Sequence, residues 1–278
     1  MDTNKVWLVT GASKGLGLSL VKKLLQEGYQ VAATSRSAES LVKEVGTNGN
    51  FLPMEVNLTD EASVNNAIAK TVKTFGRIDV VVNNAGYGQL GTIEELTDKE
   101  ARTNFDINVF GLLNVMRNAL PHLRGQRSGH IINISSIVGF LGAFPGWGIY
   151  NATKFAVAGL TEAFSAEAAS LGIKSTIVYP GYFRTNFLQE DSLCLAANPI
   201  SDYKVARELE EAHVNQIKGT QPGDPDKAAE ALISLAENEN PPLHFFMGSD
   251  SFGLAGNKIE ALQKDLANNE ALSKSTDF

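Results

Sequence analysis

Short apolar, β-branched runs alternate along the chain with longer segments in which apolar residues recur every three or four positions. The short runs predict strands and the longer segments predict amphipathic helices. The predicted strands are Val6–Thr10, Gln30–Ser35, Phe51–Val56, Val80–Asn83, His130–Ser135, Lys174–Tyr179 and Leu243–Met247. The main predicted helices are approximately Gly15–Glu27, Glu61–Phe75, Lys99–Leu120 and Tyr150–Ser170. This alternation predicts an α/β fold with one doubly wound parallel sheet of about seven strands and helices on both faces.

The strands themselves support a sheet that is covered on both sides. Val80–Val82 and Ile131–Ile132 are continuous apolar runs rather than alternating ones, as in parallel strands buried on both faces. Ligands of such Rossmann-type sheets bind beyond the carboxyl ends of the strands. We therefore expect the chemistry on the loops that follow Thr10, Asn83, Ser135 and Tyr179.

The chain shows no internal repeat and no low-complexity linker, so residues 1–278 are expected to form a single domain. Two segments depart from the alternation. Residues 182–222 separate Pro180–Gly181 from the helix expected at Pro225; long insertions of this kind are often functional lids, with a purely structural surface subdomain as the alternative. Residues 249–278 are expected to form an additional C-terminal helical tail, with an amphipathic segment at Ile259–Leu266.

Composition excludes several classes of function. The net charge of −7 argues against nucleic acid as a partner, because phosphate binding needs clustered Lys and Arg. No apolar run approaches the length of a membrane span, and no secretory leader is visible, so we expect a cytoplasmic protein without a membrane partner. A single cysteine, Cys194, rules out an intramolecular disulfide. No metal site is expected, because metal-ligand spacing is absent among the four histidines, His122, His130, His213 and His244.

The first candidate motif follows the first strand. Thr10–Gly17 has the spacing Gly-x-x-x-Gly-x-Gly and leads directly into a helix. A tight glycine turn lets backbone N–H groups approach a pyrophosphate, and the helix N-terminus adds favourable dipole charge. The segment therefore indicates a dinucleotide-binding loop.

Further motifs occur in a fixed order along the chain. They are Asn83–Gly86, Asn108 within Ile107–Gly111, Ser135–Ser136, Tyr150–Lys154 in the form Tyr-x-x-x-Lys, and Pro180–Gly181 with Thr185. Together with the glycine loop they resemble the motifs of the short-chain dehydrogenase/reductase family in its common, non-extended form. The resemblance extends from residue 5 to about residue 248. The look of the chain is nearest to the branch that contains hydroxysteroid- and retinol-dehydrogenase-like enzymes.

The resemblance implies that Asn108, Ser136, Tyr150 and Lys154 are the catalytic residues. Tyr150 and Lys154 are four positions apart on a predicted helix, so their side chains share one face. A phenol has a pKa of ~10, and a neighbouring ammonium and oxidised nicotinamide would lower it. Tyr150 would then exchange a proton with the substrate oxygen while Ser136 donates a hydrogen bond to it. In the family, Lys154 would also bind the nicotinamide ribose and Asn108 would help to position a proton-relaying water.

The residues after the second strand bear on the choice of cofactor. An NAD enzyme usually has an acidic residue there to bind the ribose 2′-hydroxyl, whereas this chain has Ser35 and Arg36. Arg36 could pair with a 2′-phosphate, and Lys14 is a second cation at the same end. In the family this pair marks a preference for NADP(H). After the third strand Asn57 replaces the usual Asp that contacts the adenine amino group, although its amide oxygen could still accept a hydrogen bond.

The resemblance thus implies a complete set of cofactor contacts. They are Gly11, Ser13, Lys14, Gly15, Leu16, Gly17, Arg36, Asn57, Leu58, Asn84, Ala85, Gly86, Tyr150, Lys154, Pro180, Gly181, Phe183 and Thr185. The aromatic and aliphatic residues expected to form the substrate pocket are Phe140, Phe144, Trp147, Phe187 and Leu188. Such a mostly apolar pocket suits a hydrophobic ketone, aldehyde or secondary alcohol. These expectations describe an NADP(H)-dependent oxidoreductase.

Two other functions and the assembly remain open at this point. A sugar-nucleotide epimerase or dehydratase of the extended branch also uses Tyr-x-x-x-Lys, but the glycine spacing argues against it. An NADP(H)-binding sensor of the same fold would not need the four catalytic residues.

Relatives often dimerise through the helices after the fourth and fifth strands, where small residues permit close packing, namely Ala156, Ala158, Gly159, Ala163 and Ala166. Because the tail could cover the surface that tetramers use, a homodimer is expected.

Overall fold

The computed structural model describes residues 3–188, 192–217 and 219–278. Its main sheet has seven parallel strands in the order β3-β2-β1-β4-β6-β7-β9. The strands are β1 Val6–Thr10, β2 Gln30–Ser35, β3 Phe51–Glu55, β4 Val80–Asn83, β6 Gly129–Ile134, β7 Ile173–Pro180 and β9 His244–Met247. The predicted fold class is confirmed, and the predicted strands differ from these only by one or two residues at their ends.

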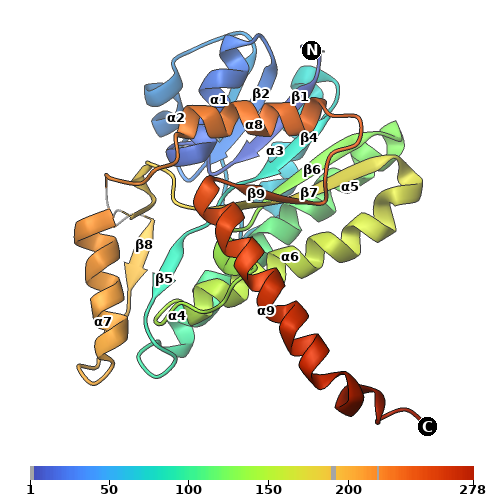
Figure 1. Cartoon of the computed structure of the whole chain (residues 1–278). Helices are drawn as coiled ribbons and strands as arrows, with labels where there is room; N and C mark the ends of the chain where they lie inside the picture. The colour runs from blue at the N-terminus through green and yellow to red at the C-terminus, as the bar shows by residue number, and fades with distance from the viewer. Residues whose placement is uncertain (1–2, 189–191, 218) are drawn as a thin grey trace.

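Helices cover both faces of this sheet (Figure 1). One face packs against α1 (Gly15–Gln26), α2 (Ala38–Val45) and α8 (Pro225–Glu237), and the other against α3 (Glu61–Phe75), α5 (Leu112–Gln126) and α6 (Gly148–Ala168). Because successive side chains of a strand point to opposite faces, Trp7 and Val9 enter the first core while Leu8 enters the second. The continuous apolar strands therefore serve two cores at once.

The helix predicted over Lys99–Leu120 is divided into three parts. Helix α4 spans Asp98–Phe105, a π-helical turn spans Asp106–Gly111, and α5 begins at Leu112. A π-helical turn inserts one residue into the helical repeat, and such turns often occur at functional sites. Here it contains Asn108, whose side chain is almost completely buried.

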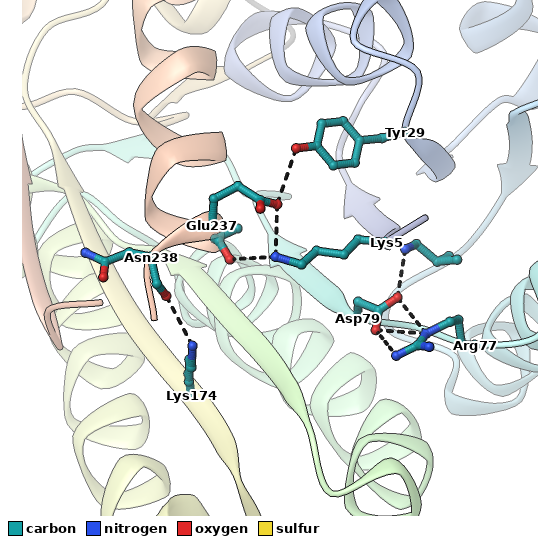
Figure 2. A network of polar contacts seen from close by, with 9 residues as sticks. Lys5, Tyr29, Arg77, Asp79, Lys174, Glu237 and Asn238 are labelled. Carbon is teal, nitrogen blue, oxygen red and sulfur yellow. Dashed lines mark hydrogen bonds and ion pairs between the residues drawn. The ribbon is translucent and has the colours of Figure 1, made fainter. Parts of the chain in front are cut away.

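The amino-terminal edge of the sheet is closed by a polar network (Figure 2). Lys5 Nζ donates to Glu237 Oε1 at 2.9 Å and to the Ala236 carbonyl at 3.3 Å, which joins the residue before β1 to the end of α8. Nearby, the Val6 N–H donates to Asp79 Oδ2 at 2.9 Å, and Arg77 forms an ion pair with the same carboxylate. These contacts fix the starts of β1 and β4 at the edge opposite to the carboxyl ends of the strands.

The segment 182–222, predicted as a lid, forms a small layer beside the carboxyl ends. It contains β8 (Leu193–Leu195), α7 (Lys204–Glu211) and a π-helical turn, Ala212–Ile217, while its residues 189–191 and 218 lie outside the described residues. Strand β8 pairs in parallel with β5 (Gly88–Leu90), which follows β4. A separate apolar cluster lies beneath this layer, so the segment is packed onto the body rather than detached from it.

The C-terminal tail is helical over most of its length. Helix α9 spans Ser249–Lys274, begins directly after β9 and extends away from the rest of the molecule (Figure 1). Only Ser251 and Ala255 of this helix are buried. Its first turn therefore belongs to the body, and its distal part is surrounded by solvent.

Candidate active site

A large cavity of about 770 Å³ follows the carboxyl ends of the strands. It extends from Arg36 after β2, past the loops after β1, β4 and β6, to Trp147 and the inner side of segment 182–222. This is the location expected for ligands of a doubly wound sheet. Of the four residues with expected catalytic roles, Ser136, Tyr150 and Lys154 line the cavity.

Helix α6 places Tyr150 and Lys154 on the same face beneath the cavity. Both side chains are deeply buried, and Lys154 Nζ lies 5.7 Å from the centre of the Tyr150 ring. Lys154 Nζ donates to the Ile134 carbonyl at 2.9 Å, and Ser135 Oγ donates to the Lys154 carbonyl at 2.9 Å. The end of β6 therefore anchors the helix at the point where it carries the two groups.

Burial dominates the ionisation of this pair. It raises the pKa of Tyr150 far above 10.0, while a hydrogen bond with Ser136 acts in the opposite direction. It lowers the pKa of Lys154 from 10.5 to about 8. The loss of hydration thus outweighs the effect expected from the neighbouring ammonium on the pKa of Tyr150. At neutral pH the phenolic oxygen of Tyr150 therefore carries its proton.

Asn108 lies behind the pair and fixes the loop after β4. Its Oδ1 accepts a hydrogen bond from the Tyr87 N–H at 3.0 Å, and its Nδ2 donates to the Tyr87 carbonyl at 3.0 Å and to Thr153 Oγ1 at 3.1 Å. Gly86 faces this side chain, and a Cβ there would lie 3.0 Å from Asn108 Oδ1 and 3.4 Å from Lys154 Nζ. The side chain joins the β4 loop to α6 and does not itself line the cavity.

The glycine loop and the loop after β4 are locked together. Thr10 Oγ1 accepts hydrogen bonds from the N–H groups of Asn84 and Ala85, both at 3.1 Å, and Asn84 Nδ2 donates to the Gly11 carbonyl at 3.0 Å. Gly11 has φ +64° and approaches Ala85 so closely that a Cβ would lie 2.7 Å from its Cα. Gly17, which was expected to contact the cofactor, lies against Asn84 and outside the cavity wall.

All the other expected cofactor residues line the cavity. Gly15 has φ +58° and lies opposite Thr185, so the glycine loop and the loop after β7 face one another. Lys14 and Arg36 line the part of the cavity beside the loops after β1 and β2, and no acidic residue follows β2 directly. Asn57 also lines it, but its Oδ1 accepts hydrogen bonds from the N–H and the hydroxyl of Thr59, at 3.1 and 2.8 Å. Both lone pairs of that oxygen are therefore used within the loop, and the expected adenine contact is not supported.

The tail contributes a residue that sequence reasoning missed. Asp250 Oδ2 accepts a hydrogen bond from the Tyr182 N–H at 2.7 Å, directly after Pro180–Gly181. A Cβ on Gly181 would collide with the Asp250 carboxylate. Ser251 Oγ in turn donates to the Tyr179 carbonyl at 2.7 Å. No local sequence signal marks these contacts, which join residues about 70 positions apart.

Two aromatic rings lie beside the ring of Tyr150. The Trp147 ring lies 5.4 Å and the Phe187 ring 6.0 Å from the Tyr150 ring, centre to centre. Phe144, Trp147, Phe187 and Leu188 all line the cavity, as expected. Phe140 does not: its ring packs edge-on against Tyr179 and Phe246, at 5.9 and 5.0 Å, beneath the loop. Several polar lining residues were not anticipated, among them Tyr182, His213 and Gln221.

Comparison with known proteins agrees with this geometry. The family model for short chain dehydrogenases matches residues 5–193. The oxidoreductase BOA17 of Botryotinia fuckeliana is 33% identical over 261 residues, which cover 93% of this chain and 94% of that protein. A short-chain dehydrogenase structure from Streptomyces avermitilis has a TM-score of 0.90 at 34% identity and covers 99% of both chains. The structure of ElxO with NADP bound has a TM-score of 0.74 at 31% identity and covers 90% of this chain and 99% of ElxO.

The chain belongs to the short-chain dehydrogenase/reductase family. It is an oxidoreductase that uses a nicotinamide dinucleotide and acts on a CH–OH or C=O group. Among residues 3–188, 192–217 and 219–278, no helix is both long and apolar enough to cross a membrane.

Proposed function

We propose that the protein is an NADP(H)-dependent carbonyl reductase that acts on hydrophobic ketones or aldehydes and, in reverse, on secondary alcohols. The observation that carries this proposal is the convergence of Ser136, Tyr150 and Lys154 in one cavity, where the rings of Trp147 and Phe187 lie beside Tyr150. The large cavity and the glycine loop fit a dinucleotide: Gly15 faces Thr185 without a side chain, and the first turn of α1 has no acidic residue.

The chemistry divides between the cofactor and the chain. When bound, the reduced nicotinamide supplies a hydride to the carbonyl carbon. Tyr150 transfers its phenolic proton to the carbonyl oxygen, which gives the alcohol, and Ser136 donates a hydrogen bond to the same oxygen as negative charge develops. Protonated Lys154 stabilises the resulting phenolate until a proton is returned from solvent. Asn108 keeps the loop after β4 in register with α6, so that Tyr150 stays at the end of the sheet.

The preference for NADP(H) rests on Arg36 and Lys14, which line the cavity at the adenosine end. Two cations in that place suit a 2′-phosphate, and a carboxylate that would repel it is absent after β2. The ElxO structure, which is similar over most of this chain, contains NADP. Both observations support the proposal from independent sides.

The test is the consumption of NADPH and NADH with a panel of apolar ketones and aldehydes, with Tyr150→Phe measured in parallel. The proposal expects NADPH-dependent turnover that falls by at least ~100-fold in the variant, while NADPH still binds. Binding of NADPH without turnover of any carbonyl in the parent protein would instead support a cofactor sensor. Equal use of NADH would contradict the roles of Arg36 and Lys14.

We propose further that the protein is a cytoplasmic homodimer. Its only cysteine, Cys194, is free, which suits a reducing compartment. Phe110 and Phe155 are 53% and 45% exposed, and the exposed face of α6 also carries the small residues Gly159 and Ala163. Such a face suits close packing against a second copy. Light scattering on the parent protein and on Phe155→Glu tests this, since the proposal expects a dimer that the charge weakens.

A further inference from the structure

Three polar side chains gather in the cavity wall at the end formed by segment 182–222. Tyr182 follows β7, His213 lies on the π-helical turn Ala212–Ile217, and Gln221 precedes the bridge between Phe183 and Gly223. Phe144, Trp147, Phe187 and Leu188 also line this end, together with the smaller polar residues Asn186, Ser192 and Cys194. His213 and Gln221 are only 4% and 2% exposed, and buried polar groups of this size require hydrogen-bond partners.

The hydrogen bonds of His213 have a fixed direction. Its Nδ1 lies 2.7 Å from the Leu209 carbonyl, which can only accept, so Nδ1 carries the proton. Burial lowers the pKa of His213, so its Nε2 is unprotonated and accepts the hydroxyl proton of Tyr182 at 2.7 Å. Burial also raises the pKa of Tyr182, which keeps that hydroxyl neutral. The phenolic oxygen of Tyr182 is consequently left with lone pairs and no proton to donate.

Gln221 supplies the complementary groups. Its side chain is 2% exposed, yet neither its amide nitrogen nor its amide oxygen has a hydrogen-bond partner among the described residues. The backbone around it is held in place, because Arg184 Nε donates to the Gln221 carbonyl at 3.2 Å and the Arg184 N–H donates to the Gly223 carbonyl at 2.8 Å. A buried amide without partners is costly, so a group that enters the cavity is its available partner.

The distances between ring centres place these groups relative to Tyr150. The Trp147 ring lies 5.4 Å from Tyr150 and 5.1 Å from His213, so one indole separates the proton donor from the polar groups. The cationic side chains that line the cavity are Lys14, Arg36 and Lys154, within the described residues. Lys154 lies beside Tyr150, and Lys14 and Arg36 line the part of the cavity beside the loops after β1 and β2. Arg184 donates to the Gln221 carbonyl but does not line the cavity, so the wall next to Gln221 presents no cation to a carboxylate of the substrate.

We propose that Tyr182 and Gln221, with His213 orienting Tyr182, bind a neutral hydrogen-bonding group of the substrate. Such a group both donates and accepts, as a hydroxyl or an amide does, and it lies about one indole width from the carbonyl. This inference rests on the proposed carbonyl reduction and narrows its substrates from apolar carbonyls in general to ketones or aldehydes that carry one such group. Tyr182 and Gln221 are then specificity-determining residues of the pocket.

The test compares two ketones of equal length, one with a hydroxyl at the far end and one with a methyl group in its place. The parent enzyme is expected to have the lower KM for the hydroxyketone. Gln221→Leu should raise that KM about tenfold, with kcat nearly unchanged and with no increase in KM for the methyl ketone. Tyr182→Phe should act in the same direction, and the double variant should lose less than the product of the two single effects.

Equal changes of KM for both ketones in Gln221→Leu would overturn the inference, as would a parent enzyme that prefers the methyl ketone. Both outcomes leave the carbonyl reduction intact. Absence of NADPH-dependent turnover with either ketone and with the whole carbonyl panel would instead contradict the proposed function itself. His213→Phe, which keeps a ring against Trp147, should reproduce the effect of Tyr182→Phe on the hydroxyketone and thereby separate the hydrogen bond from the packing.

Discussion

The carboxylate of Asp250, in the first turn of the C-terminal helix, accepts a hydrogen bond from the Tyr182 N–H at 2.7 Å. The bond holds the loop that follows β7, on which Pro180, Gly181 and Thr185 line the cavity. A residue beyond the last strand therefore shapes the wall expected to bind the nicotinamide. The close approach of Asp250 also explains why the position of Gly181 has no room for a side chain.

We expect Asp250→Ala to weaken NADPH binding by about tenfold, because a hydrogen bond to a charged acceptor contributes roughly 1.5–3 kcal/mol and the loop loses its support. Titration of NADPH fluorescence measures this change. Asp265→Ala, on the exposed part of the same helix, is the matched control and should bind NADPH like the parent. Equal affinities in both variants would show that the loop does not depend on Asp250.

The pH dependence of reduction should report Lys154. Burial lowers its pKa to about 8, so the ammonium that supports the Tyr150 phenolate is present below that pH and lost above it. We expect kcat/KM for reduction, which reflects the free enzyme, to fall as the pH rises through about 8. The folded state also binds fewer protons here than the unfolded chain between about 8 and 10.5, so this group's contribution to the free energy of unfolding increases with pH over that window. A rate that stays constant up to pH 10 would contradict the assignment.

Cofactor choice should respond to the charge at position 36. Arg36→Asp places a carboxylate where a 2′-phosphate is expected, so we predict that kcat/KM for NADPH falls by at least ~100-fold while that for NADH changes little or rises. Steady-state kinetics with both cofactors and one ketone measure the ratio. The conservative variant Arg36→Lys should keep the preference for NADPH, because it retains the charge. An unchanged ratio in Arg36→Asp would place the phosphate elsewhere.

Two phenylalanines of one loop should behave differently. Phe140 packs against Tyr179 and Phe246, whereas Phe144 lines the cavity. We expect Phe140→Ala to lower the free energy of unfolding by about 3 kcal/mol with little effect on KM, because it removes packed apolar contacts. Phe144→Ala should raise KM for apolar ketones and have a smaller effect on stability. Denaturant unfolding and steady-state kinetics on both variants distinguish the two roles. A raised KM in Phe140→Ala, with an unchanged KM in Phe144→Ala, would contradict the assignment of Phe140 to packing and of Phe144 to the cavity.

An unpaired buried amide predicts an unusual effect on stability. Gln221→Leu removes polar atoms that have no partner in the described protein, so without substrate the variant should be as stable as the parent or slightly more stable. Thermal unfolding without ligands measures this. A loss of more than about 1 kcal/mol would show that the amide has a structural partner, and it would weaken the case for a substrate contact.

The sheet could be predicted from the sequence because strands that are buried on both faces consist of continuous apolar residues, such as Val80–Val82. The catalytic groups could be located because Tyr150 and Lys154 share a helix face and follow a strand that ends at the site. The π-helical turn around Asn108 could not be predicted, since one inserted residue leaves the apolar spacing of the helix almost unchanged. The spacing of an aromatic residue in a loop likewise does not reveal its direction, which is why Phe140 was placed in the pocket.

Contacts between residues far apart in the sequence could not be predicted either. Asp250 meets Tyr182 across 68 positions, and nothing near either residue signals the pair. Tyr182, His213 and Gln221 come together only because the segment between them folds back over Trp147. Polar residues within a presumed lid are ordinary surface residues by composition, and only their burial distinguishes them. The substrate contacts therefore depend on the tertiary structure, whereas the catalytic motif does not.

Helix α9 links the cavity rigidly to an exposed end of the chain. Its first two turns place Asp250 against the Tyr182 N–H and Leu254 in the cavity wall, while every residue from position 259 onward is exposed. Both ends belong to one continuous helix. A probe attached beyond Leu266 would therefore be connected to the loop after β7 by a rigid helix and not by a flexible linker. A force applied to the carboxyl end of α9 would be transmitted through Asp250 to the loop that begins at Pro180–Gly181. The exposed end of the helix could therefore be used to perturb the cavity mechanically.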